Sequence, residues 1–268
     1  MNTELRELAL LAIAAGQEIL RHAKVGHSVS YKADGSPVTP ADRAAEDIII
    51  AGLARTAPGV LVMAEERLST GEIRPAAAPR FFLVDALDGT REFVNKRKEY
   101  TVNIALIEAG VPVVGVVVAP ALGEGYAADA GGAFAFDASQ FEPAAVRPIH
   151  ARVPSEGVAA VVSRSHETAE SEAYLRRFRI AERLSFGSSL KFCRLAEGKA
   201  DLYPRLARTM EWDIAAGDAI LRRAGGSVRT LDGQPMRYGK IDNPADEPFA
   251  NPGFVAFGAW PEDRVPRG

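Results

Sequence analysis

The chain of 268 residues contains a single cysteine, Cys193. One cysteine cannot form an internal disulfide, and it cannot supply the several thiolates of a structural zinc site. The sequence therefore excludes the class of small, disulfide-rich secreted domains. Cys193 falls in an apolar pattern with helical spacing, which is typical of a small core residue.

The chain also lacks a strong charge of one sign and a long hydrophobic run. Its formal net charge is -3, which argues against general attraction to nucleic acid or to an anionic membrane. The longest apolar run, 111–122, is too short to span a bilayer and is interrupted by Pro112, Gly115 and Pro120. The start of the chain is acidic rather than basic, so we predict an amphipathic first helix instead of a signal peptide. We expect a cytoplasmic protein without nucleic-acid partners or integral membrane segments. Peripheral attachment to the inner membrane, and the choice between monomer and homodimer, stay open.

The sequence is organised around residues 81–94. Phe81, Phe82, Leu83 and Val84 predict a buried strand, which ends on Asp85. A second acid, Asp88, follows with the turn residue Gly89, and Thr90 is placed to be the N-cap of a helix. Paired acids at the end of a strand can hold hard cations, and a helix start can hold phosphate. Both together are suited to metal-assisted hydrolysis of a phosphate ester, although turn and capping roles are the alternative for these acids.

Further acids occur at two other predicted helix or strand ends. Pro40 and Thr39 predict the start of a helix that places Asp42 in its first turn. By position alone, a helix-dipole role for Asp42 is favoured over catalysis. Glu65 and Glu66 follow a short strand at 60–64 and repeat the pattern of Asp85. A surface role is favoured for Glu66 and less so for Glu65.

The predicted elements change character near residue 150. Helices at 3–22 and from Pro40 are followed by strands that we expect to form an antiparallel sheet, at 100–107, 113–118, 125–128 and 133–136. After a proline-containing stretch at 137–154, strands and helices alternate. We predict an α+β domain over 1–150 that carries most of the acids, and an α/β domain over 151–268 that carries Asp213 and the residues of substrate recognition.

Three motifs occur in an order that resembles the inositol monophosphatase superfamily of magnesium-dependent, lithium-sensitive phosphatases. They are Glu65-Glu66, then Asp85 to Thr90, then Trp212 to Gly217. The resemblance covers nearly the whole chain and is closer to the CysQ branch of 3'(2'),5'-bisphosphate nucleotidases. The stretches that carry the closer match are 35–42, 91–93, 101–107, 163–166, 187–193 and 209–213. Ala86 replaces the usual proline after the first acid, and 206–208 replace a common Gly-Pro step.

The resemblance implies a layered αβαβα fold and hydrolysis of adenosine 3',5'-bisphosphate to AMP and phosphate, in sulfur metabolism and nucleotide recycling. Hydrolysis of the corresponding phosphosulfate, PAPS, is a related expectation. Two or three Mg²⁺ ions would be bound by four carboxylates and one backbone carbonyl, those of Glu65, Asp85, Asp88, Asp213 and Leu87. Thr90 and Asp42 would form a hydrogen-bonded pair that positions and deprotonates the attacking water, with Glu65 also taking part in catalysis.

Substrate contacts are expected from both domains. The phosphate to be removed would lie near Leu87, Asp88, Gly89, Thr90 and Asp213, where backbone N–H groups can bind its oxygens. The second domain offers polar candidates for the nucleotide and its 5'-phosphate, namely Ser163, Arg164, Ser188, Ser189 and Lys191. Structural capping or surface roles are the alternative for these five. Two other functions stay open: an inositol or sugar monophosphatase on the same fold, and a non-catalytic binding protein.

Overall fold

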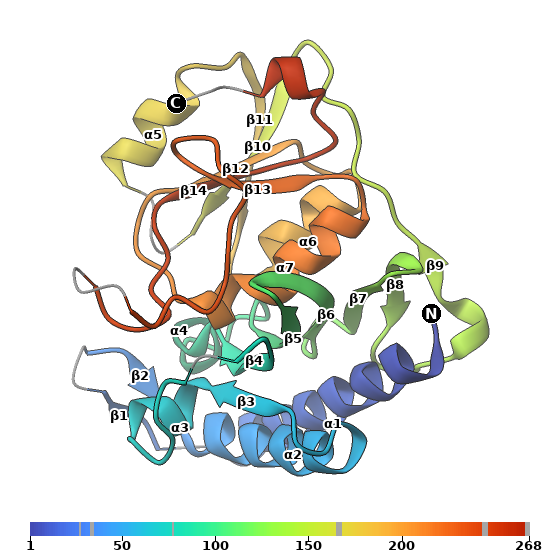
Figure 1. Ribbon diagram of the computed structural model, residues 1–268, viewed down its shortest axis with the longest axis vertical. Coiled ribbons are helices and arrows are strands. Elements are labelled where there is room, and N and C mark those ends of the chain that lie inside the picture. The colour runs from blue at the N-terminus through green and yellow to red at the C-terminus, as the bar shows by residue number, and fades with distance from the viewer. Residues whose placement is uncertain (27, 33–34, 77, 165–167, 243–245, 266–268) are drawn as a thin grey trace.

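The computed structural model describes residues 1–26, 28–32, 35–76, 78–164, 168–242 and 246–265. Its elements stack in five layers, helix, sheet, helix, sheet, helix (Figure 1). The expected αβαβα arrangement is confirmed. Ser165 and His166 of the stretch 163–166 lie outside the described residues. Within the ranges described, every helix is too short or too polar to cross a membrane.

Two long N-terminal helices form the first layer. Helix α1 (Thr3–Val25) buries Leu5, Leu8, Ala12 and Ile19, which recur at helical spacing. Helix α2 (Pro40–Thr56) packs beside it and against the first sheet. Gly52 of α2 lies against Leu11 of α1, where a Cβ atom would be 2.3 Å from the leucine Cδ1. The Leu11 side chain therefore fills the space beside Gly52 and would have to move to accommodate a larger residue there.

The second layer is a sheet of seven strands in the order β3-β4-β5-β6-β7-β8-β9. Neighbouring strands are antiparallel except β3 and β4, which are parallel, so the predicted antiparallel sheet is confirmed with one exception at its edge. The strands are β3 (Leu61–Ala64), β4 (Arg80–Asp88), β5 (Thr101–Glu108), β6 (Val111–Ala119), β7 (Glu124–Asp129), β8 (Gly132–Asp137) and β9 (Arg147–Pro148). Short elements accompany them: a hairpin of β1 (Ser30–Tyr31) and β2 (Pro37–Val38), helices α3 (Glu65–Ser69) and α4 (Thr90–Val94), and the 3-10 turn Pro143–Ala145.

Two helices, α6 (Leu190–Ala196) and α7 (Glu211–Arg223), lie between the first sheet and the second (Figure 1). The second sheet has the order β11-β10-β12-β14-β13 and mixes parallel with antiparallel pairs. Its strands are β10 (Val158–Ser163), β11 (Ile180–Phe186), β12 (Leu202–Arg205), β13 (Ser227–Thr230) and β14 (Phe254–Phe257). Helix α5 (Ala169–Leu175) forms the fifth layer, and a 3-10 turn at Glu262–Arg264 follows β14.

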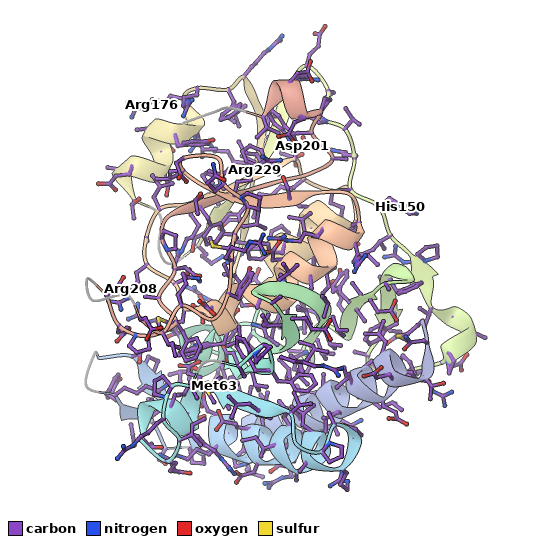
Figure 2. All side chains as sticks on the ribbon, in the orientation of Figure 1. Met63, His150, Arg176, Asp201, Arg208 and Arg229 are labelled. Atoms are coloured by element: carbon purple, nitrogen blue, oxygen red, sulfur yellow. The ribbon has the colours of Figure 1, made fainter. Side chains whose placement is uncertain are left out.

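Alternate residues of the second sheet face different cores. Tyr203 and Phe254 belong to the large cluster shared with α6, α7 and the first sheet. Leu202 and Val255, one position along each strand, instead pack with Leu175 of α5. This is the two-residue period of a strand that is covered on both faces. Side chains fill the space between the layers, with Met63 labelled in the first sheet and Asp201 near the second (Figure 2).

The large cluster joins the two predicted domains. It contains Phe81 and Leu83 of the first sheet together with Phe192 of α6 and Phe254 of the second sheet. Helix α7 lies directly on β6, where a Cβ atom at Gly115 would be 2.4 Å from the carbonyl oxygen of Ala216. The division of the chain into two domains near residue 150 stays a prediction, because this cluster contains residues from both parts.

One local prediction is wrong. Thr90 was expected to be the N-cap of the helix after β4, but Gly89 is the N-cap and Thr90 is the first helical residue. Gly89 has a φ of 93°, a left-handed conformation that glycine adopts without a Cβ clash. This frees the Thr90 hydroxyl from capping its own helix. Cys193 is buried in the core, as expected.

Candidate active site

A cavity of about 320 Å³ lies where the two sheets come together around α4, α6 and α7. The ends of β3 and β4 and the first turn of α7 bring their acids to its wall. The lining includes Glu65, Asp85, Asp88 and Asp213, the predicted acids, with Leu87, Gly89 and Thr90 of the central stretch. The residues expected around a metal and a phosphate are therefore assembled in one place.

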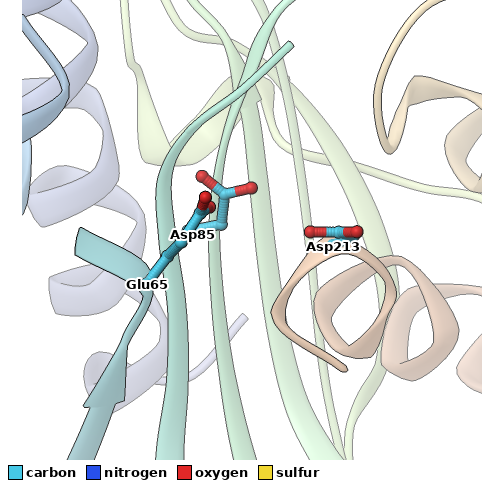
Figure 3. Close-up of side chains that lie close together, drawn as sticks. All are labelled: Glu65, Asp85 and Asp213. Carbon is cyan, nitrogen blue, oxygen red and sulfur yellow. The ribbon is translucent and has the colours of Figure 1, made fainter. Parts of the chain in front are cut away.

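Three of the acids meet closely although they are far apart in the sequence. Glu65 directly follows β3, Asp85 lies in β4, and Asp213 is the third residue of α7. One carboxylate oxygen from each lies within 4.8 Å of the other two. Figure 3 shows Glu65 and Asp85 pointing toward one another, with Asp213 facing them from the start of its helix. Packing of α7 on the first sheet places Asp213 here, 128 residues after Asp85.

Backbone N–H groups orient the acids. Asp85, Asp88 and Asp213 each accept a backbone N–H on one carboxylate oxygen, which helps to fix the rotation of the carboxylate. The donors are the N–H of Leu87 to Asp85 (3.0 Å), of Met210 to Asp213 (2.8 Å) and of Ser189 to Asp88 (2.7 Å). The bond from Met210 also closes the first turn of α7, so the same contact builds the helix start and aims Asp213.

The acids carry more negative charge than the protein compensates. Burial and the neighbouring carboxylates raise the pKa of Asp85 and of Asp213 well above the usual range. Burial raises the pKa of Asp88 to about 6, against the opposing effect of Lys191. A divalent cation would remove this repulsion, and an all-oxygen ligand set is the one that Mg²⁺ prefers. The donor set therefore fits the metal that the sequence predicts.

Lys32, which the sequence analysis did not single out, partly compensates the acids. Its Nζ atom lies 2.6 Å from Glu65 and 2.7 Å from Glu66. These glutamates raise the pKa of Lys32 despite its burial. Glu66 is 7% exposed, so its expected surface position is wrong. The backbone of Glu66 is held against α2, because its N–H donates to the carboxylate of Glu46 at 2.8 Å.

Asp42 and Thr90 form the predicted hydrogen bond. The Thr90 hydroxyl donates to Asp42 Oδ1 at 2.9 Å, and the other oxygen of Asp42 accepts from the N–H and hydroxyl of Thr39. Asp42 thus closes the capping box of α2 and contacts the cavity wall with the same carboxylate. Burial raises the pKa of Asp42, and the hydrogen bonds from Thr39 and Thr90 oppose that shift.

The polar candidates of the second half divide into two groups. Ser163, Ser188 and Lys191 line the cavity. Ser189 is buried and bonded to Asp88, while Arg164 pairs with Glu99 and donates to the carbonyl of Ser185. Neither Ser189 nor Arg164 is among the described residues that line the cavity. A substrate contact for any of the five stays a prediction.

The sequence analysis missed two cations of the cavity wall, Arg205 and Arg208. Arg205 is the last residue of β12, is 7% exposed and donates to Ser163 Oγ at 3.3 Å. Lys191 is also buried, and burial lowers its pKa to about 8. Arg205 lies two residues after Tyr203 on β12 and so on the same face of the strand, which would have been the signal if the sequence had defined a strand as far as Arg205. Cations and acids thus share one cavity.

Comparison with known proteins supports the resemblance. A sequence model of the inositol monophosphatase family matches residues 1–253. The 3'(2'),5'-bisphosphate nucleotidase CysQ of Escherichia coli strain K12 is 44% identical over 84% of this chain and 87% of its own length. The protein of that name from Salmonella typhimurium is 42% identical over 93% of this chain and 98% of its own.

Solved structures agree with the sequence matches. CysQ of Bacteroides thetaiotaomicron superposes with a TM-score of 0.80 at 35% identity, over 96% of this chain and 98% of that one. An IMPase of Thermotoga maritima has a TM-score of 0.73 at 24% identity, over 94% and 90% of the two chains, and shows likeness of fold alone.

Proposed function

The chain belongs to the inositol monophosphatase family, and we propose from this premise that it removes the 3'-phosphate of adenosine 3',5'-bisphosphate to give AMP and phosphate. One observation carries the choice of substrate: a single cavity holds a cluster of acids together with the buried cations Lys191 and Arg205. The acids suit the reacting phosphate and its metal, and the cations suit a second phosphate.

We further propose that the metal is Mg²⁺, bound as two or three ions. The ligands would be the carboxylates of Glu65, Asp85, Asp88 and Asp213 with the carbonyl of Leu87. When bound, the metal would lower the pKa of the attacking water and stabilise the negative charge on the leaving oxygen. The observations that support this are the distances within 4.8 Å among Glu65, Asp85 and Asp213 and the raised pKa values of Asp85 and Asp213.

Thr90 and Asp42 would hold the water and take its proton. The Thr90 hydroxyl lies 2.9 Å from Asp42 Oδ1 and 3.1 Å from the carbonyl oxygen of Leu87, which are both acceptors. When its proton is donated to Asp42, the oxygen lone pairs of Thr90 can accept from a water in the cavity. A proton that leaves the water for Thr90 Oγ is balanced by transfer of the threonine proton to Asp42 Oδ1. The N–H groups of Gly89 and Thr90, at the start of α4, would bind oxygens of the phosphate being removed.

Phosphate release by the purified protein in Mg²⁺ tests the proposal. Adenosine 3',5'-bisphosphate and inositol 1-phosphate are compared, each with and without Li⁺, and Asp85→Asn is the inactive control with its fold checked by circular dichroism. We expect strong preference for the nucleotide and inhibition by Li⁺. Preference for inositol 1-phosphate would favour a monophosphatase on the same fold. No release from either would favour a non-catalytic binding protein.

The role of Lys191 in holding the second phosphate gives a sharper test. Lys191→Met is expected to raise KM for adenosine 3',5'-bisphosphate by at least about 10-fold, since it removes a buried charge partner. With 3'-AMP, which lacks the second phosphate, the change in KM should be much smaller. Lys199→Met is the matched control, because Lys199 is exposed and pairs with Glu197. Equal losses on both substrates would contradict this role.

A further inference from the structure

A buried chain of hydroxyl and amide groups connects the acid Asp88 with Ser188 on the cavity wall. Its inner members, Thr101 and Asn103 on β5 and Ser189 before α6, are each at most 1% exposed. The contacts are Ser188 Oγ to Thr101 Oγ1 at 2.9 Å, Thr101 Oγ1 to Ser189 Oγ at 2.8 Å, Ser189 Oγ to Asn103 Oδ1 at 2.7 Å, and Asn103 Nδ2 to Asp88 Oδ2 at 3.5 Å. We call these five residues the hydroxyl chain.

Counting protons sets the direction of every bond in the hydroxyl chain. The amide nitrogen of Asn103 faces the Asp88 carboxylate, so the amide oxygen must accept the single hydroxyl proton of Ser189. Thr101 Oγ1 lies 2.8 Å from Ser189 Oγ and a longer 3.5 Å from Asp88 Oδ2. Because the Ser189 proton is already used, the shorter contact requires Thr101 to donate to Ser189. By the same count, Ser188 donates to Thr101. The chain is therefore polarised from the cavity wall toward the carboxylate.

A second connection fixes the backbone of the same loop. The Ser189 N–H donates to Asp88 Oδ2 at 2.7 Å, the oxygen that also faces Asn103. Ser188 has a φ of 46°, which costs energy for a residue with a Cβ atom, so the contacts around it must hold it there. Gly187 lies against the Glu99 backbone, where a Cβ atom would be 2.7 Å from the carbonyl oxygen. The loop 187–191 and Asp88 are thus connected through both backbone and side-chain contacts, so a change at one affects the other.

We propose that Thr101 is a positioning residue that couples the two sides of the cavity. Thr101 is fully buried and is not among the described residues that line the cavity. A substrate held by Ser188 and Lys191 fixes the hydroxyl chain and with it the rotation of Asp88, so substrate and metal each tighten binding of the other. The inference rests on the proposed function for Asp88 as a metal ligand, for the substrate contacts of Ser188 and Lys191, and for the choice of nucleotide as probe.

Isothermal titration calorimetry tests the coupling. Mn²⁺ binding is measured with and without saturating AMP, and AMP binding with and without Mn²⁺, for the wild type, Thr101→Val and Thr101→Ser. Valine keeps the size of the side chain but removes the hydroxyl, whereas serine keeps the hydroxyl. In the wild type, we expect Mn²⁺ and AMP each to lower the dissociation constant of the other by at least about 5-fold. In Thr101→Val this factor should fall below about 2, with Mn²⁺ affinity about 10-fold weaker, and Thr101→Ser should restore both.

Ser189→Ala is the second variant, because it breaks the hydroxyl chain at the next link and keeps the backbone N–H to Asp88. It should also lose the coupling, and it keeps the test decisive if Thr101→Val does not fold. Thr56→Val, which removes a hydroxyl at the end of α2, is the control. A lower melting temperature with unchanged dissociation constants and unchanged coupling overturns the inference. Weakened Mn²⁺ binding in a protein that neither binds AMP nor hydrolyses the bisphosphate would instead overturn the proposed function alone.

Discussion

The contacts of Asp42 allow its structural role and its proposed catalytic role to share one side chain. One oxygen of its carboxylate accepts from Thr39 and closes the capping box of α2, while the other accepts from Thr90. The first role makes the second possible, because the cap fixes the rotation of the carboxylate. The position of Asp42 in the first turn of α2 therefore favours a helix-dipole role, and this role is compatible with the proposed catalytic one.

Thr90→Val tests the catalytic half of this pair. Valine has nearly the shape of threonine but cannot hold the water or relay its proton, so we expect kcat to fall by about 100-fold or more. The melting temperature should change little, because Asp42 keeps both bonds from Thr39. Steady-state kinetics and thermal melts check both expectations. Thr56→Val is the control, because Thr56 lies in α2, the helix that carries Asp42, but is away from the cavity lining; it should keep the wild-type kcat. A kcat that is unchanged in Thr90→Val would contradict the catalytic role of Thr90.

At the scale of elements, helix α7 packs on the first sheet and also supplies an acid to the site. Its body lies on β5 and β6, and its first turn presents Asp213 to Glu65 and Asp85. The position of Asp213 therefore depends on how closely the helix can approach the sheet. Gly115 of β6 permits that approach, with no side chain between the strand and the backbone of Ala216.

Gly115→Ala should consequently damage stability and metal binding together. The new methyl group would meet backbone at 2.4 Å, which a side-chain rotation cannot relieve. Overpacking of this kind costs about 1–3 kcal/mol, and we expect the melting temperature to fall by several degrees. Calorimetry should also show weaker Mn²⁺ binding, because α7 moves away from β4. Gly131→Ala is the control, since its nearest contact is the side chain of Asp129 in a turn. Unchanged Mn²⁺ affinity in a destabilised Gly115→Ala would contradict the link.

Most elements could be predicted from local patterns, and the contacts between distant segments could not. The start of α1 at Thr3 and the start of α2 at Pro40 were predicted as observed, because an amphipathic period and a Thr-Pro helix start are local signals. The position of Lys32 against Glu65 depends on a hairpin folding over β3, which no nearby residue reveals. Thr101 and Asn103 looked like ordinary strand residues, since their polar partners come from a loop more than 80 positions away.

The predicted acids of the site came from two sources. Paired carboxylates after a strand drew attention to Asp85 and Asp88 on chemical grounds alone. Asp213 and the functional role of Asp42 needed the resemblance to a family, because spacing in sequence carries no information about their approach in space. The roles of the predicted site residues remain predictions, and the variants above test them.

At the scale of the whole molecule, the buried acids make stability depend on pH. An acid whose pKa is raised by folding binds its proton more tightly in the folded state. Its stabilising contribution is complete below the unfolded value near 4 and is lost as pH rises through the folded value. For Asp88 that value is about 6, for Glu66 about 7, and for Asp85 and Asp213 the shift has the same direction.

We therefore expect the metal-free protein to melt several degrees lower at pH 7.5 than at pH 5, since each 1 kcal/mol corresponds to about 2–4 °C in a chain of this size. Mg²⁺ should raise the melting temperature at pH 7.5 and have little effect at pH 5, where protons compete for the acids. Differential scanning calorimetry in a chelator and in Mg²⁺ measures both.

Asp85→Asn is the matched variant, because asparagine can still accept the Leu87 N–H. It should melt higher than the wild type at pH 7.5 in the chelator and respond less to Mg²⁺. A metal-free wild type that is more stable at pH 7.5 than at pH 5 would contradict the account.

The separation of Asp85 and Asp213 along the chain has a consequence for biosynthesis. A ribosome that adds roughly 5–20 residues per second needs about 6–26 s to pass from one to the other. Throughout that interval the nascent chain has Glu65, Asp85 and Asp88 but lacks the helix that completes the cluster. If Asp213 binds the metal as proposed above, hydrolytic activity begins only after α7 has been made and has docked on the first sheet.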